Sequence, residues 1–143
     1  ERAHDEAERR RLLTFVIVGG GPTGVELAGA LAEIAHYSLS DEFRTIEPEH
    51  SRIVLIERGP TILPTFPEPL RRAARKSLER LDVEVHEGGT GVTAIEPGLV
   101  KFDNQTLAAS EVCLGCAPSD GFSEAVEQFL RLIEATFFVP AAG

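Results

Sequence analysis

The first regular hydrophobic pattern in the chain is a short apolar run from Phe15 to Val18. After a turn rich in glycine, apolar residues recur every three or four positions, which predicts a helix from about Thr23 to about Ser38. A β-branched run directly before such a helix is typical of a buried strand in a parallel sheet. The pattern therefore predicts a strand, a glycine turn and a helix in this order.

The same alternation then repeats. We predict a second strand at Arg52–Glu57, a second helix from about Glu68 to Leu81 and a third strand that starts at Val83–His86. We expect the inner face of the second helix to consist of Leu70, Ala73, Ala74, Ser77, Leu78 and Leu81. We expect its solvated face to carry Arg71, Arg72, Arg75, Lys76 and Arg80. The β-α-β-α-β order predicts an α/β, Rossmann-like parallel sheet with right-handed crossovers.

From Gly88 onwards, glycines separate short alternating pieces. These pieces, at Val92–Ile95, Leu99–Phe102 and Thr106–Leu107, predict an antiparallel three-strand meander on one face of the parallel sheet. A returning strand is predicted at Ser110–Gly115. We expect three parts: a helical lead-in from a larger parent at 1–11, a dinucleotide-binding domain at 12–117, and an amphipathic helical tail at 118–143. The polar face of the tail is acidic, which favours packing against the domain or a partner chain, including a homodimer, over a membrane surface.

Net charge, apolar runs and cysteine content limit the partners and the compartment that we expect for this chain. The net charge of −9 over 143 residues argues against nucleic acid or an anionic membrane as the main partner. No apolar run reaches the roughly eighteen residues of a membrane span. Cys113 and Cys116 make no disulfide framework, so we expect a cytoplasmic, reducing compartment.

The C-x-x-C at Cys113–Cys116 has three interpretations. It is a redox disulfide, half of a zinc site, or two small residues at a buried strand end, which is the interpretation we favour. No second pair or nearby histidine accompanies it, and His36, His50 and His86 are scattered. We therefore expect no metal.

The glycine turn itself has the spacing G-x-G-x-x-G, with Gly19, Gly21 and Gly24 as its glycines. Gly19 suits a tight turn, Gly21 lets a pyrophosphate approach the backbone, and Gly24 lets the helix pack on the sheet. Pro22 suits the start of a helix, whose free N–H groups attract phosphate. The predicted cofactor-binding residues of this turn are Gly19, Gly20, Gly21, Pro22, Thr23 and Gly24.

Glu57 bears on the choice of cofactor. It ends the second strand, thirty-three positions after Gly24 (57 − 24), where the usual spacing is about twenty. An acid here accepts hydrogen bonds from the adenosine ribose and repels a 2′-phosphate, which favours NADH over NADPH. The neighbouring Arg58 is a second candidate cofactor-binding residue, because an arginine can bind that phosphate. The alternative for Glu57 is an ordinary charge at a strand end.

With these motifs placed, the chain closely resembles the NADH-binding domain of type II NADH dehydrogenases. These belong to the two-dinucleotide-fold flavoproteins that include the pyridine nucleotide–disulfide oxidoreductases. The resemblance lies in LLTFVIVGGGPTGVELAGALAE (12–33), IVLIERGPTILPTF (53–66) and, more loosely, 78–102. It implies that the domain is inserted in an FAD domain, and that the enzyme passes a hydride from NADH to FAD and electrons to a quinone. It also implies a parent that is peripheral on the inner face of the membrane.

The resemblance further implies roles for two residues. Glu26, in the first helical turn, matches a family glutamate near the nicotinamide and the flavin–quinone site, and is the candidate catalytic residue. Val112–Ala117, which includes Gly115, corresponds to the family segment that faces the nicotinamide. Low-molecular-weight thioredoxin reductases carry their C-x-x-C before the glycine motif, whereas here it follows.

Two functions follow from these features. The first is the NADH-binding module of an NADH:quinone oxidoreductase, which positions the nicotinamide for a flavin carried elsewhere and is inactive alone. The second is a non-catalytic NADH sensor or assembly module, or the NAD domain of another disulfide-oxidoreductase-like flavoprotein. An FAD glycine motif upstream in the parent reading frame distinguishes the enzyme from the sensor.

Overall fold

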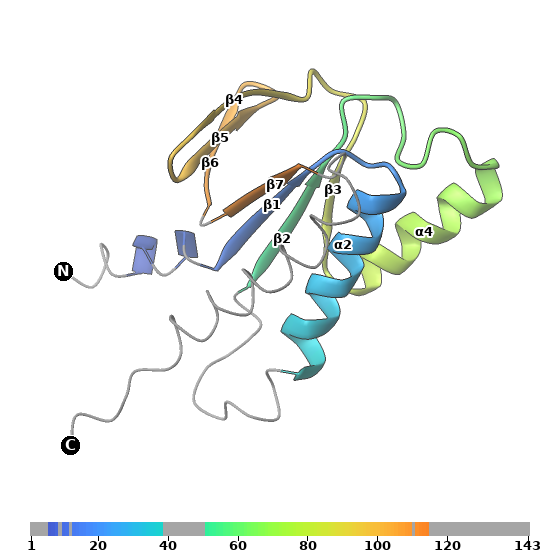
Figure 1. Cartoon of the computed structure of the whole chain (residues 1–143), viewed down its shortest axis with the longest axis horizontal. Coiled ribbons are helices and arrows are strands. Elements are labelled where there is room, and N and C mark those ends of the chain that lie inside the picture. The colour runs from blue at the N-terminus through green and yellow to red at the C-terminus, as the bar shows by residue number, and fades with distance from the viewer. Residues whose placement is uncertain (1–5, 9, 12, 39–50, 110, 115–143) are drawn as a thin grey trace.

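The computed structural model describes residues 6–8, 10–11, 13–38, 51–109 and 111–114, and contains two sheets. The parallel sheet has the order β3-β2-β1-β7, built from β1 (Thr14–Val18), β2 (Arg52–Ile56), β3 (Glu84–His86) and β7 (Glu111–Leu114). Helices α2 (Pro22–Glu33) and α4 (Glu68–Arg80) cover one face (Figure 1). The antiparallel sheet of β4 (Val92–Glu96), β5 (Leu99–Phe102) and β6 (Gln105–Ala108) lies on the other face. The predicted Rossmann-like fold with an antiparallel meander is confirmed.

Strand β1 lies inside the parallel sheet and is covered on both faces. Phe15 and Ile17 pack in the cluster that contains Leu31 of α2, while Val16 packs in a second cluster with Val100 of β5. All five side chains are almost fully buried. A central strand covered on both faces has no polar side, which explains its unbroken apolar run.

The first predicted helix extends to Ser38, as expected, but changes its geometry near the end. After α2, residues Ile34–Ser38 form the π-helical segment η1. His36 of this segment places Nε2 2.9 Å from the carbonyl oxygen of Leu81, just beyond α4. The two helices are therefore joined at this end.

The prediction for the faces of α4 is wrong in part. Leu78 is buried and Ala74 and Leu81 pack against the core, but Leu70 is 55% exposed and both Ala73 and Ser77 face solvent. Arg71 and Arg75 are instead partly buried. Two physical causes account for this: the start of the helix projects beyond the sheet (Figure 1), and Arg75 is drawn inward by an ion pair with Glu87.

Helix α4 ends in a Schellman motif whose left-handed residue is an aspartate. The Asp82 N–H donates to the Glu79 carbonyl (3.0 Å) and the Val83 N–H donates to the Leu78 carbonyl (3.0 Å). Asp82 has φ of +59°, in the region where glycine is favoured. The helix end is thus satisfied through a residue with a strained backbone.

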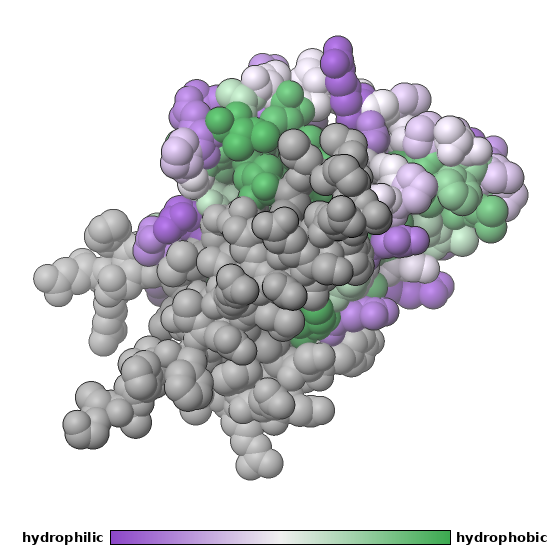
Figure 2. All heavy atoms as spheres, viewed as in Figure 1, coloured by the Kyte–Doolittle hydropathy of each residue, from purple (hydrophilic) through white to green (hydrophobic). Residues whose placement is uncertain are grey.

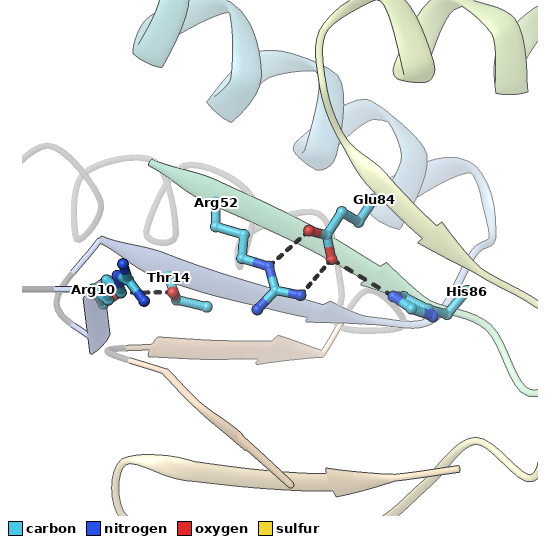
Figure 3. A network of polar contacts seen from close by, with 5 residues as sticks. All are labelled: Arg10, Thr14, Arg52, Glu84 and His86. Carbon is cyan, nitrogen blue, oxygen red and sulfur yellow. Dashed lines mark hydrogen bonds and ion pairs between the residues drawn. The ribbon is translucent and has the colours of Figure 1, made fainter. Parts of the chain in front are cut away.

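Polar side chains link the strands on the face opposite the helices (Figure 3). Arg52 of β2 donates from Nε (2.7 Å) and Nη2 (2.8 Å) to the two carboxylate oxygens of Glu84 in β3. His86 Nε2 lies 3.7 Å from the same carboxylate. The Thr14 hydroxyl donates to the Arg10 carbonyl (2.7 Å) and so joins the N-terminal segment to β1. Hydrogen bonds from Arg52 hold the pKa of Glu84 below its ordinary value.

Among the residues that the structure describes, three large hydrophobic side chains are exposed. Phe66, Leu70 and Ile95 are 38%, 55% and 50% exposed. Figure 2 shows hydrophobic surface near the start of α4 and over the antiparallel sheet. Within the described segments, every helix is too short or too polar to span a bilayer.

Candidate functional site

The glycine loop lies at the carboxyl end of β1, where it turns into α2. Gly19 has φ of +111°, a conformation that side chains disfavour, so a glycine fits the tight turn. Its N–H donates to the Ile56 carbonyl (2.8 Å), and the carbonyl of Gly20 accepts from the Leu63 N–H (2.7 Å). The loop is therefore held against the end of β2.

Gly20 is the most tightly enclosed residue of this loop. A Cβ there would lie 2.9 Å from Cγ2 of Ile62 and 3.0 Å from both Cβ and Oε2 of Glu57. The motif assigns no separate role to this position, because its neighbours come from a segment almost forty residues later in the chain. Its constraint is visible only in the folded structure.

Gly21 differs, because its surroundings are open. It is the N-cap of α2, its carbonyl accepts from the Val25 N–H (3.0 Å), and a Cβ built on it would meet nothing within 4 Å. Pro22 occupies the first helical position and Gly24 is buried where α2 meets the sheet. The free N–H groups of the first turn thus adjoin open space, as an approaching phosphate requires.

Glu57 directly follows β2 and reaches back to the glycine loop. Its Oε2 accepts from the Gly20 N–H (2.6 Å) and its Oε1 accepts from the Gly59 N–H (2.8 Å). An ionised carboxylate has about four acceptor positions, so two remain for further donors. The structure therefore places the predicted ribose acceptor beside the glycine loop, in a fixed orientation.

Arg58 is exposed, and its aliphatic stem packs beside Gly91. A Cβ on Gly91, which has φ of +75°, would lie 2.9 Å from the Arg58 Cβ. No hydrogen bond or ion pair among the described residues involves its guanidinium. The charge is therefore available to solvent or to a ligand.

Glu26 lies on the second turn of α2 and not on the first turn, where it was predicted. Helix α2 begins at Pro22, so Glu26 is its fifth residue and the first turn contains no acid. The glutamate is exposed on the second turn and gains little from the helix dipole, whose effect falls off within the first turn. The prediction that Glu26 lies in the first helical turn is wrong, because the helix starts one residue earlier than predicted.

The remaining predicted site residues are partly outside the described residues. Cys113 belongs to β7 and lies opposite Ile17 of β1 in the register. Gly115 and Cys116 fall outside, as does the 118–143 tail, so their roles and the domain limits stay predictions. Among the described residues, no three His, Cys, Asp or Glu side chains gather as metal ligands would.

The sequence analysis missed Glu87, the residue after β3. Its Oε2 accepts from the Ile62 N–H (2.9 Å) and its Oε1 lies 2.5 Å from Nη2 of Arg75. Its position after a strand is the same as that of Glu57, which was the available signal. Two neighbouring strands therefore each end in an acid that binds a backbone amide near the glycine loop.

The loop after Glu87 is anchored to the antiparallel sheet. Asp103 Oδ1 accepts from the Thr90 N–H (2.6 Å), the Thr90 hydroxyl (3.0 Å) and the Gly91 N–H (3.1 Å). These bonds, the Thr90 hydroxyl foremost, hold the pKa of Asp103 below its usual value. The segment that carries Glu87 is thus fixed at both ends.

Comparisons with known proteins find a matching family and similar curated sequences. The sequence model of the family described as pyridine nucleotide-disulphide oxidoreductase matches residues 1–127. The chain is 46% identical over 96 residues to the type II NADH:quinone oxidoreductase NdhA of Mycobacterium tuberculosis, covering 67% of this chain and 20% of that protein. It is 36% identical over 97 residues to the mitochondrial external NADH-ubiquinone oxidoreductase 2 of Saccharomyces cerevisiae, covering 68% of this chain and 17% of that protein.

A solved structure has the same arrangement of elements. The structure of NDH2 from Plasmodium falciparum in complex with NADH matches with a TM-score of 0.68 and 23% identity, over 76% of this chain and 23% of that one. At this identity the match shows the fold. The chain spans about a fifth of the length of the curated relatives it matches.

Proposed function

The chain belongs to the pyridine nucleotide-disulphide oxidoreductase family, and on that basis we propose that it is the NADH-binding domain of a type II NADH:quinone oxidoreductase. The observation that carries the proposal is the pairing of open space at Gly21 with the Glu57 carboxylate, which is bound to the preceding residue, Gly20. The first accommodates a pyrophosphate and the second accepts ribose hydroxyls. The names of two curated relatives, an NADH:quinone and an NADH-ubiquinone oxidoreductase, support NADH as the nucleotide.

Each group at the site has a defined task in this proposal. The first-turn N–H groups of α2 bind the pyrophosphate, and the two remaining acceptor positions of Glu57 bind the adenosine ribose. We assign Arg58 to the adenine side or to solvent, and Glu26 and Gly115 to the nicotinamide side. When bound, NADH would supply a hydride for the FAD of the parent enzyme. The chain itself binds the nucleotide and sets its orientation.

The wider setting is also part of the proposal. We place FAD and the quinone site in the rest of the parent chain, whose flavin domain is the partner of this one. We place the parent enzyme on the cytoplasmic side, peripheral to the membrane. An upstream FAD glycine motif in the parent reading frame would favour this enzyme over a stand-alone NADH sensor.

Calorimetric titration with NADH tests the proposal. The 143-residue chain should bind NADH, and Gly21→Val should abolish binding while the circular dichroism spectrum is retained, because the added side chain enters the space for the pyrophosphate. The chain alone should not reduce a quinone. Equal NADH affinity in a folded Gly21→Val variant would overturn the proposal, as would quinone turnover with stoichiometric FAD on this chain.

A further inference from the structure

The segment from Glu57 to Leu63 carries the ribose acceptor but has neither helix nor strand. Its position therefore depends on individual contacts. The Gly88 N–H donates to the Gly59 carbonyl (2.7 Å), and Nη2 of Arg75 donates to the Thr61 hydroxyl (3.2 Å). The Ile62 N–H adds a further contact, because it donates to Glu87 (2.9 Å).

We propose that Glu87 is a positioning residue for the adenosine half of the nucleotide, acting through Ile62 on Gly20 and Glu57. This inference rests on the proposed function. A continuous series of contacts connects α4 to the glycine loop. The series begins with Arg75 of α4, which pairs with Glu87 at 2.5 Å.

Ile62 is the central contact of the series. It is fully buried, and its Cγ2 lies directly under Gly20, 2.9 Å from where a Cβ would be. The next residue, Leu63, donates its N–H to the Gly20 carbonyl (2.7 Å). A displacement of Ile62 therefore moves the Gly20 amide, which is the donor that orients the Glu57 carboxylate.

The surroundings of Glu87 make it suitable for this role. Its side chain is only 20% exposed and that of Arg75 is 32% exposed, so the pair is partly shielded from water. Both carboxylate oxygens have a donor at a fixed place, Ile62 on one side and Arg75 on the other. A carboxylate held in this way holds its amide partner in turn, which preorganises the loop for its ligand.

For the loss of Glu87, the proposal predicts a change in nucleotide affinity of opposite sign to the change that charge repulsion alone predicts. Removing Glu87 removes a negative charge that repels an anionic ligand, so the loss of Coulomb repulsion alone would tighten binding. A positioning role predicts weaker binding, because the ribose acceptor loses its orientation. The sign of the change in affinity therefore separates the two.

The experiment is a calorimetric titration of the 143-residue chain with ADP-ribose and with NADH. Glu87→Ala should lower the affinity for both ligands about tenfold, as expected for the loss of one charge-assisted hydrogen bond. Glu87→Gln retains an acceptor oxygen for the Ile62 N–H and should weaken them only about threefold. Glu79→Ala, which removes an exposed carboxylate of α4, is the matched control and should leave both affinities unchanged.

A double-mutant cycle with Glu57→Gln identifies the route. In that background Glu87→Ala should lower the nucleotide affinity much less, because residue 57 no longer carries the carboxylate whose orientation depends on Glu87. Unchanged or tighter binding in the Glu87 variants would overturn the inference, as would an undiminished effect in the Glu57→Gln background. Failure of the parent chain to bind NADH would overturn the proposed function instead, and the inference with it.

Discussion

The carboxylate of Glu57 and the backbone amide of Gly20 are joined by a hydrogen bond of 2.6 Å, although the two residues are 37 positions apart in the chain. The bond connects the end of β2 to the glycine loop that follows β1. It leaves no room for a side chain on Gly20. Recognition of the ribose and the shape of the phosphate loop therefore depend on the same carboxylate.

Substitutions at Gly20 and Gly21 should separate stability from binding. Gly20→Ala forces a Cβ against Ile62 and Glu57 and should lower the free energy of unfolding by about 1 to 3 kcal/mol. Gly21→Ala meets no atom within 4 Å and should leave stability nearly unchanged while weakening NADH binding. Urea unfolding of both variants tests this, and equal stability of the two would contradict it.

Glu57→Gln should narrow the preference for NADH over NADPH. The neutral amide no longer repels the 2′-phosphate, so NADPH affinity should rise on the order of tenfold, with a smaller loss for NADH. Titration of both nucleotides against both proteins measures this. If the parent chain binds the two nucleotides equally well, Glu57 is only a charge at a strand end. Arg58→Ala is the companion variant, and should lower NADPH affinity most where Glu57 is already replaced.

Asp82→Gly should stabilise the protein. Glycine adopts the left-handed conformation without the strain of a Cβ, and the change also removes a negative charge from the C-terminal end of α4. We expect a gain of about 0.5 to 1 kcal/mol in the free energy of unfolding. Asp82→Ala removes the charge but keeps the Cβ, so it should gain less. A larger gain in the alanine variant would assign the effect to charge alone.

Acid should weaken the bond between β2 and β3. Because Arg52 lowers the pKa of Glu84 in the folded chain, this pair contributes stability above the ordinary glutamate pKa of about 4.3 and loses it as the pH falls through the lower, folded value. For a pair this exposed the contribution is about 0.2 to 1 kcal/mol. Glu84→Gln should therefore flatten the fall in unfolding free energy below pH 4.3.

Glu68→Gln is the control for this pH dependence. Its pair with Arg72 lies within one helix, with side chains 68% and 64% exposed. Glu84→Gln should flatten the curve of stability against pH more than this control does. Equal flattening in both variants would show that the Arg52–Glu84 pair has no special role.

The order of elements was predictable because local periodicity encodes it. The apolar run of β1 and the helical spacing after Gly24 depend only on near neighbours in the chain. The two faces of α4 were less predictable, because the position of Arg75 is decided by Glu87 in another element. Local pattern placed the helix correctly but not its rotation.

In the candidate site, too, some features were predictable from local sequence and others depend on distant contacts. Glu57 was identifiable from its place after a strand, whereas the constraint on Gly20 arises from Ile62, more than forty residues away. The role of Glu87 requires knowing where the Ile62 amide points. Such contacts between distant residues produce no periodic pattern in the sequence, so local patterns cannot predict them.

The strand order has a consequence for how the chain folds. Phe15 of β1 pairs with Glu111 of β7, a separation of 96 residues (111 − 15). During synthesis, one edge of the strand that carries the glycine loop stays open until almost the whole domain has emerged. Long-range parallel pairing is slow, and an open edge invites association with other chains. We expect pulsed hydrogen exchange to show the β1–β7 amides protected after those of β4–β5, so the nucleotide site is completed last.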